Sequence, residues 1–539
     1  MIPGLTAADA QAPAPPGPIC GAKPSDGSGA PATVLLTGYG TGGFAVRTKS
    51  ARAQAFFNNG MQLAHAFAHK ASASAFVAAQ RADPNCAMCV WGEAWARGPT
   101  INYPVDLAAQ KELAAMADKA AALAKDGPEK ERRLTAALQR RYTSGGGKGP
   151  GDLAFAKAMD QLARDHPRDS ELAIMAADAW MIPASLKDNR ENLDKALALL
   201  EAVLKRRPND TGAIHFYIHA TENDGVTARA LPYALKLQAL APAASHLIHM
   251  PSHTYYGVGR YADAVRSNLD AVAVDDGNAR RLNMPDVWDL TYHGHSVTFG
   301  TSAALMDGDG EAALKLARMA IGQIGRKESG GGFSNSVLAR AYFAEGRYGG
   351  TTEVAALADP GETRPYPRAM WRYARGEAAA RRGDAAALKG ETALVRLTPE
   401  DVKRMGGSPR TAQTMVDVGR LTLEGRGAML ERHWDDAAKA FRAAAELQET
   451  KLAGMTDPPP WWFPVRRSLA AAELAAGRPS DAARDAKTAL DHWPADPMSL
   501  LVLAQAERAM GHPAAAQLRM AEARRGWRGE ALAIGPAGA

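Results

Sequence analysis

Two histidine-containing stretches recur in this chain at a fixed offset of 34 residues. The first reads HFYIHATENDG from His215 to Gly225, and the second reads HMPSHTYYGVG from His249 to Gly259. Each stretch carries two histidines four positions apart and a glycine ten positions after the first of them. Histidine is scarce, with 13 in 539 residues, so two copies of the same pair indicate a structural repeat.

The same interval separates other residues that punctuate helices, such as Pro208 from Pro242 and Gly477 from Gly511. A 34-residue helix–turn–helix period is that of tetratricopeptide repeats. HWDDAAKAF and SHTYYGVGRYADAVRSN follow the pattern of these repeats, the second with Asn268 where Phe is usual. Hydrophobic residues make up 46% of the chain and are mostly the helix formers alanine and leucine. We therefore predict an all-α, right-handed tetratricopeptide-repeat solenoid of about nine to eleven helix pairs.

One solenoid is predicted over residues 51–528, because stacked repeats share a continuous core. Residues 1–50 are rich in Ala, Pro and Gly and should be disordered or extended, and residues 529–539 should form a flexible tail. Interrupting loops are predicted near residues 97–106, 143–152 and 326–333.

The N-terminal segment also bears on location and partners. It lacks a basic region followed by an apolar one, so it is not an intact signal peptide, and it looks like the polar start of an exported protein. We expect a periplasmic or secreted protein, with the cytoplasm as the alternative.

The whole chain contains no run of 18 apolar residues, so no membrane span is predicted. The net charge of +6 is spread without a dense basic stripe, which argues against nucleic acid as a partner. The oligomeric state stays open.

The two histidine pairs predict a metal site. Residues four apart lie on one helix face, so His215 and His219 form one stripe, and His249 and His253 form the next. Equivalent helices of stacked repeats lie about 8–10 Å apart. Two pairs of imidazoles can close that gap around one ion, with metal–nitrogen distances near ~2.0–2.1 Å. Neutral imidazoles suit copper or zinc.

Further candidates extend this site. His246 lies one turn before His249, and His295 falls on the corresponding helix one repeat later, so either could be a further ligand. Glu222 and Tyr256 would flank the ion, as acid/base groups or as partners that fix an imidazole tautomer. First helices of tetratricopeptide pairs line the concave groove, so the stripes should face it. The other predicted groove-lining residues are His65, His69, Tyr217, Trp91 and Trp95.

Pro251 and the pair Cys86 and Cys89 each allow two structural interpretations. Pro251 lies inside the second stripe and marks either a kink or a late helix start. Cys86 and Cys89 are either two small buried residues or partners in a disulfide, with each other or with Cys20. In neither case do we expect these cysteines to ligate the ion.

The chain also resembles a largely uncharacterised group of bacterial tetratricopeptide-repeat proteins, over about residues 55–525. The resemblance rests on the motifs AFFNNGMQLAHAFAHKASASAF, DPNCAMCVWGEAWARGPTIN, HFYIHATE, HLIHMPSHTYYGVGRYADA, YPRAMWRYARG and PPPWWFPVRRSLAAAELAAGR. It implies the repeat fold and the histidine motifs, and it names no reaction. Members often carry a histidine at the position of Thr298, which removes one ligand here, and Thr100 stands where Asn is expected.

Two functions follow from these patterns. The first is a metal-dependent protein acting on a small organic substrate, where zinc would favour hydrolysis and copper oxidation, two cases that the sequence does not distinguish. The second is a scaffold that holds a peptide or partner helix in the groove, with histidines that contact it or sense pH. The chain has no nucleophile elbow, HExxH helix or Walker loop, so whether it is an enzyme stays open.

Overall fold

The computed structural model describes residues 34–143, 149–184, 190–328, 333–405, 407–530 and 532–539. Within these ranges the chain is all-α, and its only β pairing is an isolated bridge between Gly535 and Gly538. None of the described helices is long and apolar enough to cross a membrane. The predicted all-α solenoid is confirmed.

The helices follow one another with short connections. The N-terminal helices are α1 (Ala51–His65), α2 (His69–Ala82), α3 (Ala87–Ala96), α4 (Leu107–Ala124), α5 (Glu129–Thr143), α6 (Pro150–Asp165), α7 (Ser170–Ala184) and α8 (Arg190–Arg206). The central elements are α9 (Thr211–Asn223), η1 (Thr227–Ala230), α10 (Leu231–Leu240), α11 (Ser245–His249), α12 (Pro251–Gly257), α13 (Tyr261–Arg281), η2 (Val287–Asp289), α14 (His293–Asp307), α15 (Gly310–Ile321) and α16 (Asn335–Tyr348). The C-terminal helices are α17 (Thr351–Ala356), α18 (Pro365–Arg382), α19 (Ala385–Thr392), α20 (Pro399–Arg404), α21 (Pro409–Leu430), α22 (Trp434–Lys451), α23 (Arg466–Ala475), α24 (Pro479–His492), α25 (Pro497–Ala509) and α26 (Pro513–Arg525).

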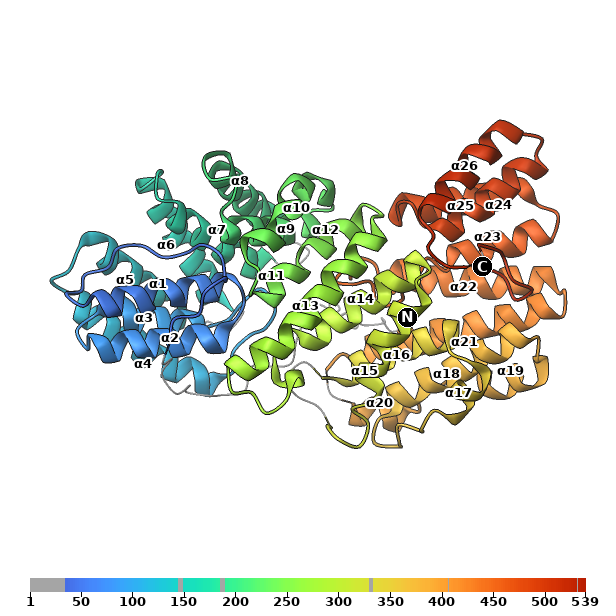
Figure 1. Cartoon of the computed structure of the whole chain (residues 1–539), viewed down its shortest axis with the longest axis horizontal. Helices are drawn as coiled ribbons and strands as arrows, with labels where there is room; N and C mark the ends of the chain where they lie inside the picture. The colour runs from blue at the N-terminus through green and yellow to red at the C-terminus, as the bar shows by residue number, and fades with distance from the viewer. Residues whose placement is uncertain (1–33, 144–148, 185–189, 329–332, 406, 531) are drawn as a thin grey trace, which may run out of the picture.

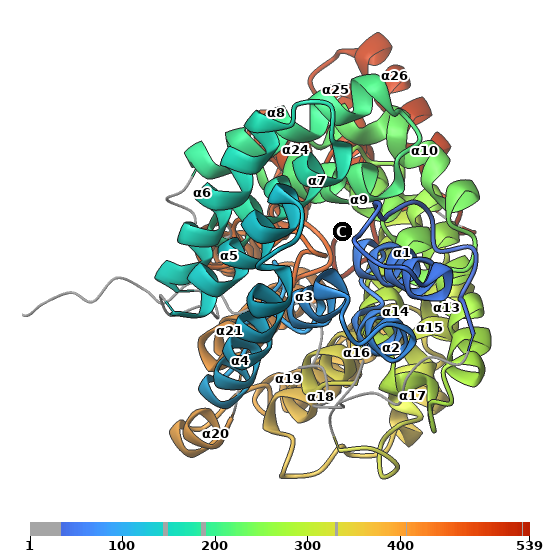
Figure 2. The same ribbon diagram turned by 90° about the vertical axis from the view of Figure 1, so that its left-hand side faces the viewer.

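Successive helices form hairpins that stack along one elongated solenoid, from α1 at one end to α26 at the other (Figure 1). Viewed from the N-terminal end, the helices are arranged around a common axis (Figure 2). Glycines make the turns between paired helices, and Gly259, Gly383, Gly477 and Gly511 all adopt positive φ, from 73° to 83°. Such left-handed positions end helices at low cost only when the residue lacks a Cβ.

Close helix packing in the first repeat depends on two other glycines. Phe76 of α2 is fully buried between Gly60 of α1 and Gly92 of α3. A Cβ at Gly60 would lie 2.7 Å from the Phe76 ring, and one at Gly92 would lie 2.3 Å from it. Both glycines therefore let neighbouring helices approach an aromatic side chain that a larger residue would displace.

The segment before α1 is extended and docked on the solenoid. Leu36 exchanges two hydrogen bonds with the Asn59 side-chain amide, at 2.9 and 2.7 Å. The backbone N–H of Thr41 donates to Thr211 Oγ1 at 2.7 Å. Residues 1–50 are predicted from the sequence to be disordered or extended. Residues 34–50 are extended in the structure, and residues 1–33 lie outside the described residues.

The last residues of the predicted flexible tail contact the solenoid in the structure. Ser468 Oγ donates to the carbonyl of Ala539 at 2.5 Å, and Arg426 Nη1 donates to the carbonyl of Ala537 at 3.1 Å. Both alanines are buried. Of the predicted loops, residues 97–106 connect α3 to α4, while 144–148 and 329–332 lie outside the described residues.

The buried apolar side chains form successive clusters along the solenoid. The first runs from the N-terminal helices to Met250, with Tyr292 added, and the second begins at Tyr255. The histidine-rich helices α9, α11, α12 and α14 lie near the middle of the long axis (Figure 1). Their histidines therefore form a polar boundary between two apolar cores.

Candidate metal centre

Four helices supply the histidines. His215 and His219 come from α9, His246 and His249 from α11, His253 from α12 and His295 from α14. The start of α9 is fixed by the Asp210 side chain, which accepts a hydrogen bond from the N–H of Ala213.

Pro251 divides the second stripe into two helices. It occupies the first position of α12, where its missing N–H removes no helical hydrogen bond. Met250, at the junction, keeps helical angles (φ −51°, ψ −38°). The N–H of Met250 donates to the carbonyl of His246, and the N–H of His253 donates to the carbonyl of Met250. His246, His249 and His253 therefore stay on one continuous face across the junction.

The six histidines converge in the interior as two groups of three. The first group is His215, His219 and His246, and the second is His249, His253 and His295. Within each group, the potential ligand atoms all lie within 4.8 Å of one another. All six side chains are at most 6% exposed. The four histidines predicted to share one ion are thus divided evenly between two groups, and each group gains a third histidine from the predicted further ligands.

A third group connects the other two. His219, Glu222 and His253 also place their ligand atoms within 4.8 Å of one another. The rings of His219 and His253, which belong to different groups, have centroids 5.4 Å apart. Glu222 is therefore positioned between the two histidine groups.

Hydrogen bonds fix the tautomers in the second group. His249 Nδ1 lies 2.6 Å from Asn268 Oδ1, and Asn268 Nδ2 donates to the carbonyl of Ala264, which identifies Oδ1 as the acceptor. His253 Nδ1 lies 2.8 Å from Glu222 Oε2. Both Nδ1 atoms must therefore carry hydrogen, and both Nε2 atoms are left to act as ligands. These Nε2 atoms face each other at 2.9 Å.

The first group repeats this arrangement. His215 Nδ1 donates to the backbone carbonyl of His65 at 2.6 Å, so the neutral ring presents an unprotonated Nε2. This Nε2 lies 3.1 Å from Nε2 of His246. His219 Nε2 is buried without a hydrogen-bond partner in the described part of the chain. Nitrogen lone pairs that face one another in a dry interior need a proton or a cation between them.

Burial sets the charge of most of these rings. Desolvation lowers the pKa of His215 to about 3 and holds the pKa values of His219, His246 and His249 well below 6.5. The neighbouring imidazoles lower the four values further. These rings are therefore neutral at physiological pH, which is the form that binds metal ions.

His253 is the exception. Burial lowers its pKa, but the carboxylates of Glu222 and Asp457 outweigh burial and raise the value to about 9. Burial likewise raises the pKa of Glu222, against the opposing effect of His253. The protonated His253 ring then carries a positive charge, and its Nε2 faces both His249 Nε2 and Asp457 Oδ1. A metal ion bound here would replace that proton.

Asp457 is a site residue that the sequence does not reveal. It lies between α22 and α23, and its Oδ1 is 3.4 Å from His253 Nε2 and 3.2 Å from His295 Nε2. No local pattern connects it to histidines so far away in the chain. Asn268, by contrast, could have been noticed in the sequence, because it stands where the repeat usually has Phe. In the structure this position contacts His249.

A cavity of about 500 Å³ adjoins the centre on the side of the second group. Glu222, His253 and Tyr256 contribute to its wall. Apolar residues of the segment after α22, among them Met455 and Trp461, form another part of the wall. The cavity can therefore bring a small molecule to His253 and Glu222, while the other histidines stay covered.

The predicted groove-lining residues are mostly interior instead. Trp91 is fully buried and donates from Nε1 to the carbonyl of Leu134. Trp95 stacks on Trp91, with ring centroids 5.5 Å apart. Tyr217 points away from the centre and donates to Glu201 at 3.0 Å, because residues two apart lie on opposite sides of a helix.

The remaining predicted residues surround the centre. His65 pairs with Glu171 at 3.0 Å and reaches the centre only through its carbonyl. His69 is partly buried next to the ring of Phe67 and does not belong to either histidine group.

Two hydroxyl residues near the centre bond to backbone carbonyls. Tyr256 donates to the carbonyl of Trp462 at 3.4 Å, and the Phe299 ring contacts both Tyr256 and His253. Thr298 bonds back to the carbonyl of Gly294.

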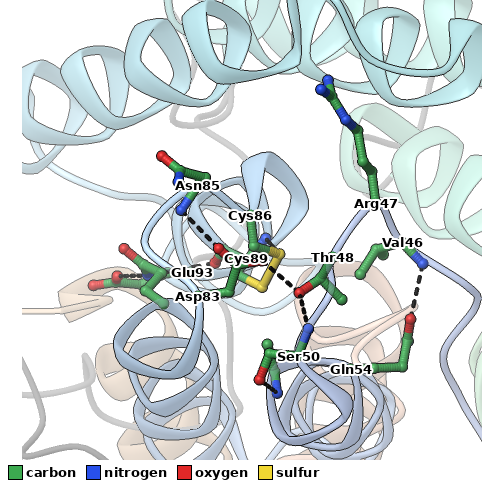
Figure 3. The surroundings of a disulfide bond; sticks show 12 residues. Val46, Arg47, Thr48, Ser50, Gln54, Asp83, Asn85, Cys86, Cys89 and Glu93 are labelled. Atoms are coloured by element: carbon green, nitrogen blue, oxygen red, sulfur yellow. Dashed lines mark hydrogen bonds between the residues drawn. A yellow bond between two sulfur atoms is a disulfide. The ribbon is translucent and has the colours of Figure 1, made fainter.

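Cys86 and Cys89 form a disulfide with each other, which decides between the alternatives for this pair. The bond lies at the start of α3, next to the segment that leads into α1 (Figure 3). Both cysteines are fully buried, and neither belongs to a potential metal-binding group among the described residues.

The fold and the site together define an all-α repeat solenoid with a buried polyhistidine centre. No protein-family model matches the sequence, and no curated protein matches it. The human IFIT1 dimer with m7Gppp-AAAA matches with 12% identity over 81% of this chain and 90% of that one, at a TM-score of 0.34. The Cut9–Hcn1 heterotetramer of APC/C matches with 13% identity over 84% and 76%, at a TM-score of 0.29. The P58(IPK) TPR domain matches with 13% identity over 66% and 93%, at a TM-score of 0.20. Likenesses at this level indicate no function.

Proposed function

We propose that this chain is a metal-dependent protein whose buried histidines bind copper or zinc. The observation that carries the proposal is the orientation of the rings. His215, His249 and His253 each direct Nδ1 to an oxygen acceptor, so that their Nε2 atoms point inward. Metal-binding histidines are held by outer partners in this way. The neutral, buried nitrogen donors suit copper or zinc.

The adjoining cavity supports action on a small organic substrate. A bound ion with an open position would supply a Lewis acid and, for zinc, an activated hydroxide. Glu222 lines the cavity and accepts a hydrogen bond from His253, so it can hold a proton beside the substrate. The apolar wall around Trp461 excludes water from bound molecules. Copper and zinc remain alternatives for the ion, and oxidation and hydrolysis remain alternatives for the reaction.

Metal analysis of protein purified without a histidine tag tests the proposal. We expect about one or two equivalents of one ion per chain, as the number of nitrogen ligands implies. His215→Ala and His253→Ala should each lower the metal content, whereas His512→Gln should not, because His512 is exposed and pairs with Glu507. A wild-type protein that stays metal-free after incubation with copper and with zinc would contradict the proposal.

The second candidate is a scaffold that holds a peptide or partner helix without catalysis, and the repeat fold favours it. The burial of the six histidines argues against their contacting such a partner, because none is more than 6% exposed. Absence of metal, combined with capture of a defined peptide, would favour the scaffold.

We also propose that the protein acts in the periplasm or is secreted, and that it belongs to the bacterial repeat group that its motifs resemble. The disulfide between Cys86 and Cys89 supports an oxidising location. Fractionation of cells that naturally produce the protein tests the location, and recovery with cytoplasmic markers would contradict it.

A further inference from the structure

We propose that the centre is dinuclear, with one ion in each group of three histidines and a small bridging anion between them. This inference rests on the proposed function, because it requires that the histidines bind metal at all. It goes further by assigning every histidine to one of two sites. The first site comprises His215, His219 and His246, and the second comprises His249, His253 and His295.

The spacing of the nitrogens argues against a single ion. Ligands of one ion with bonds of ~2.0–2.1 Å lie within about 4.2 Å of one another. Among the described residues, the six histidines meet even a 4.8 Å limit as two separate groups of three. One ion could therefore bind one group, and the facing nitrogens of the other group would then need a proton between them.

Each group is complete as a site of its own. Each has one close Nε2 pair, His215 with His246 at 3.1 Å and His249 with His253 at 2.9 Å. Each has a third imidazole beside that pair. His219 supplies it in the first group, with a buried Nε2 that has no hydrogen-bond partner among the described residues. Three imidazoles supply three of the four ligands of a tetrahedral site, and one position is left for another ligand.

The two histidine groups lie close together. Ligand atoms of His219 and His253 are within 4.8 Å of each other, so ions bound to them would be no more than about 9 Å apart. Rings of the two groups also approach at His246 and His249, with centroids 5.7 Å apart. This upper limit includes the separation of about 3.5–4 Å at which one small anion contacts both ions in other two-metal sites.

The charges of the centre also favour two cations and an anion. Imidazoles bind metal ions in their neutral form, so the six rings would add no charge to a loaded centre, and the nearest carboxylates are Glu222 and Asp457. Glu222 belongs to the group that connects the two sites, and Asp457 contacts His253 and His295 of the second site. Two divalent ions exceed the charge of two carboxylates, so the buried site should take up a small anion such as hydroxide.

Metal stoichiometry separates this inference from the proposed function. Tag-free protein is loaded with copper(II), passed over a desalting column and analysed for metal per chain. We expect about two equivalents for wild type, and about one each for His246→Gln and His295→Gln, since each substitution removes a ligand from one site only. His512→Gln is the control and should keep two. Circular dichroism and thermal unfolding establish that each variant is folded.

The outcomes are distinguishable. No bound metal in folded wild type refutes the proposed function. One equivalent in wild type, lost in both variants, refutes the dinuclear centre and leaves the proposed function standing. Electron paramagnetic resonance provides the second measurement. Wild type with two copper ions should show a signal weakened by coupling between them, and azide should alter it, while either variant should give the signal of isolated copper(II). Two independent signals in wild type would refute the bridged pair.

Discussion

Replacement of Asn268 tests whether the orientation of the histidines governs metal binding. Asn268 is fully buried, and its Oδ1 is the hydrogen-bond partner of His249 Nδ1 at 2.6 Å. In Asn268→Ala that N–H loses its acceptor, which costs about 1–3 kcal/mol if it stays buried and unpaired. The His249 ring can avoid this cost by taking the other tautomer, but its Nε2 then carries hydrogen and can no longer bind a metal.

Loss of such an outer partner typically lowers metal affinity about 10–100-fold. This corresponds to about 1.4–2.8 kcal/mol of binding free energy. The matched control is Asn268→Asp, which keeps an oxygen acceptor for His249 and should retain most of the affinity.

The dissociation constants are measured by competition with a chelator of known affinity, and thermal unfolding of metal-free protein reports stability separately. The reasoning fails if the alanine variant binds metal as tightly as wild type. It fails equally if the aspartate variant loses as much affinity as the alanine variant, since the acceptor would then be irrelevant.

Three further substitutions test other parts of the structure. Gly92→Ala should destabilise the fold by about 1–3 kcal/mol in urea unfolding, since its Cβ would lie 2.3 Å from the Phe76 ring; a neutral result would refute the close packing. Replacing Cys86 and Cys89 together with alanine should leave the metal content unchanged, and loss of the metal would contradict their exclusion from the centre. Burial raises the pKa of Asp307 to about 7, above its unfolded value of about 3.9, so its ionisation lowers stability as the pH rises between these values. Asp307→Asn should therefore gain stability relative to wild type between about pH 4 and pH 8, and an unchanged difference across that range would refute this.

The repeat architecture could be predicted from the sequence because it depends on local signals. Gly259, Gly477 and Gly511 mark turns at which the backbone must take a left-handed conformation, and they fall at the predicted positions. The histidine stripes follow equally from helix periodicity, which places residues four apart on one face. The sequence alone was therefore enough to predict which helices carry the histidines.

The arrangement of the side chains was not accessible in the same way. Asp457 reaches His253 and His295 from a distant connection between helices, and no spacing rule relates it to them. The same segment places the carbonyl of Trp462 against Tyr256 and Asp457 against His253. His253 is only 1% exposed, although the sequence predicts that it faces an open groove. Tertiary contacts of this kind depend on how far the solenoid curves, which the repeat period does not specify.

The duplication of the histidine pair now has a structural explanation. Repeat stacking brings the two pairs next to each other, but ring orientation does not merge them into one four-histidine site. His215 turns toward His246, while His249 turns toward His253, with His295 from the next repeat beside them. Each pair is thus completed by a histidine outside its own motif. Repetition of a two-histidine helix therefore produces two three-histidine groups, which contact each other where His219 meets His253 and where His246 meets His249.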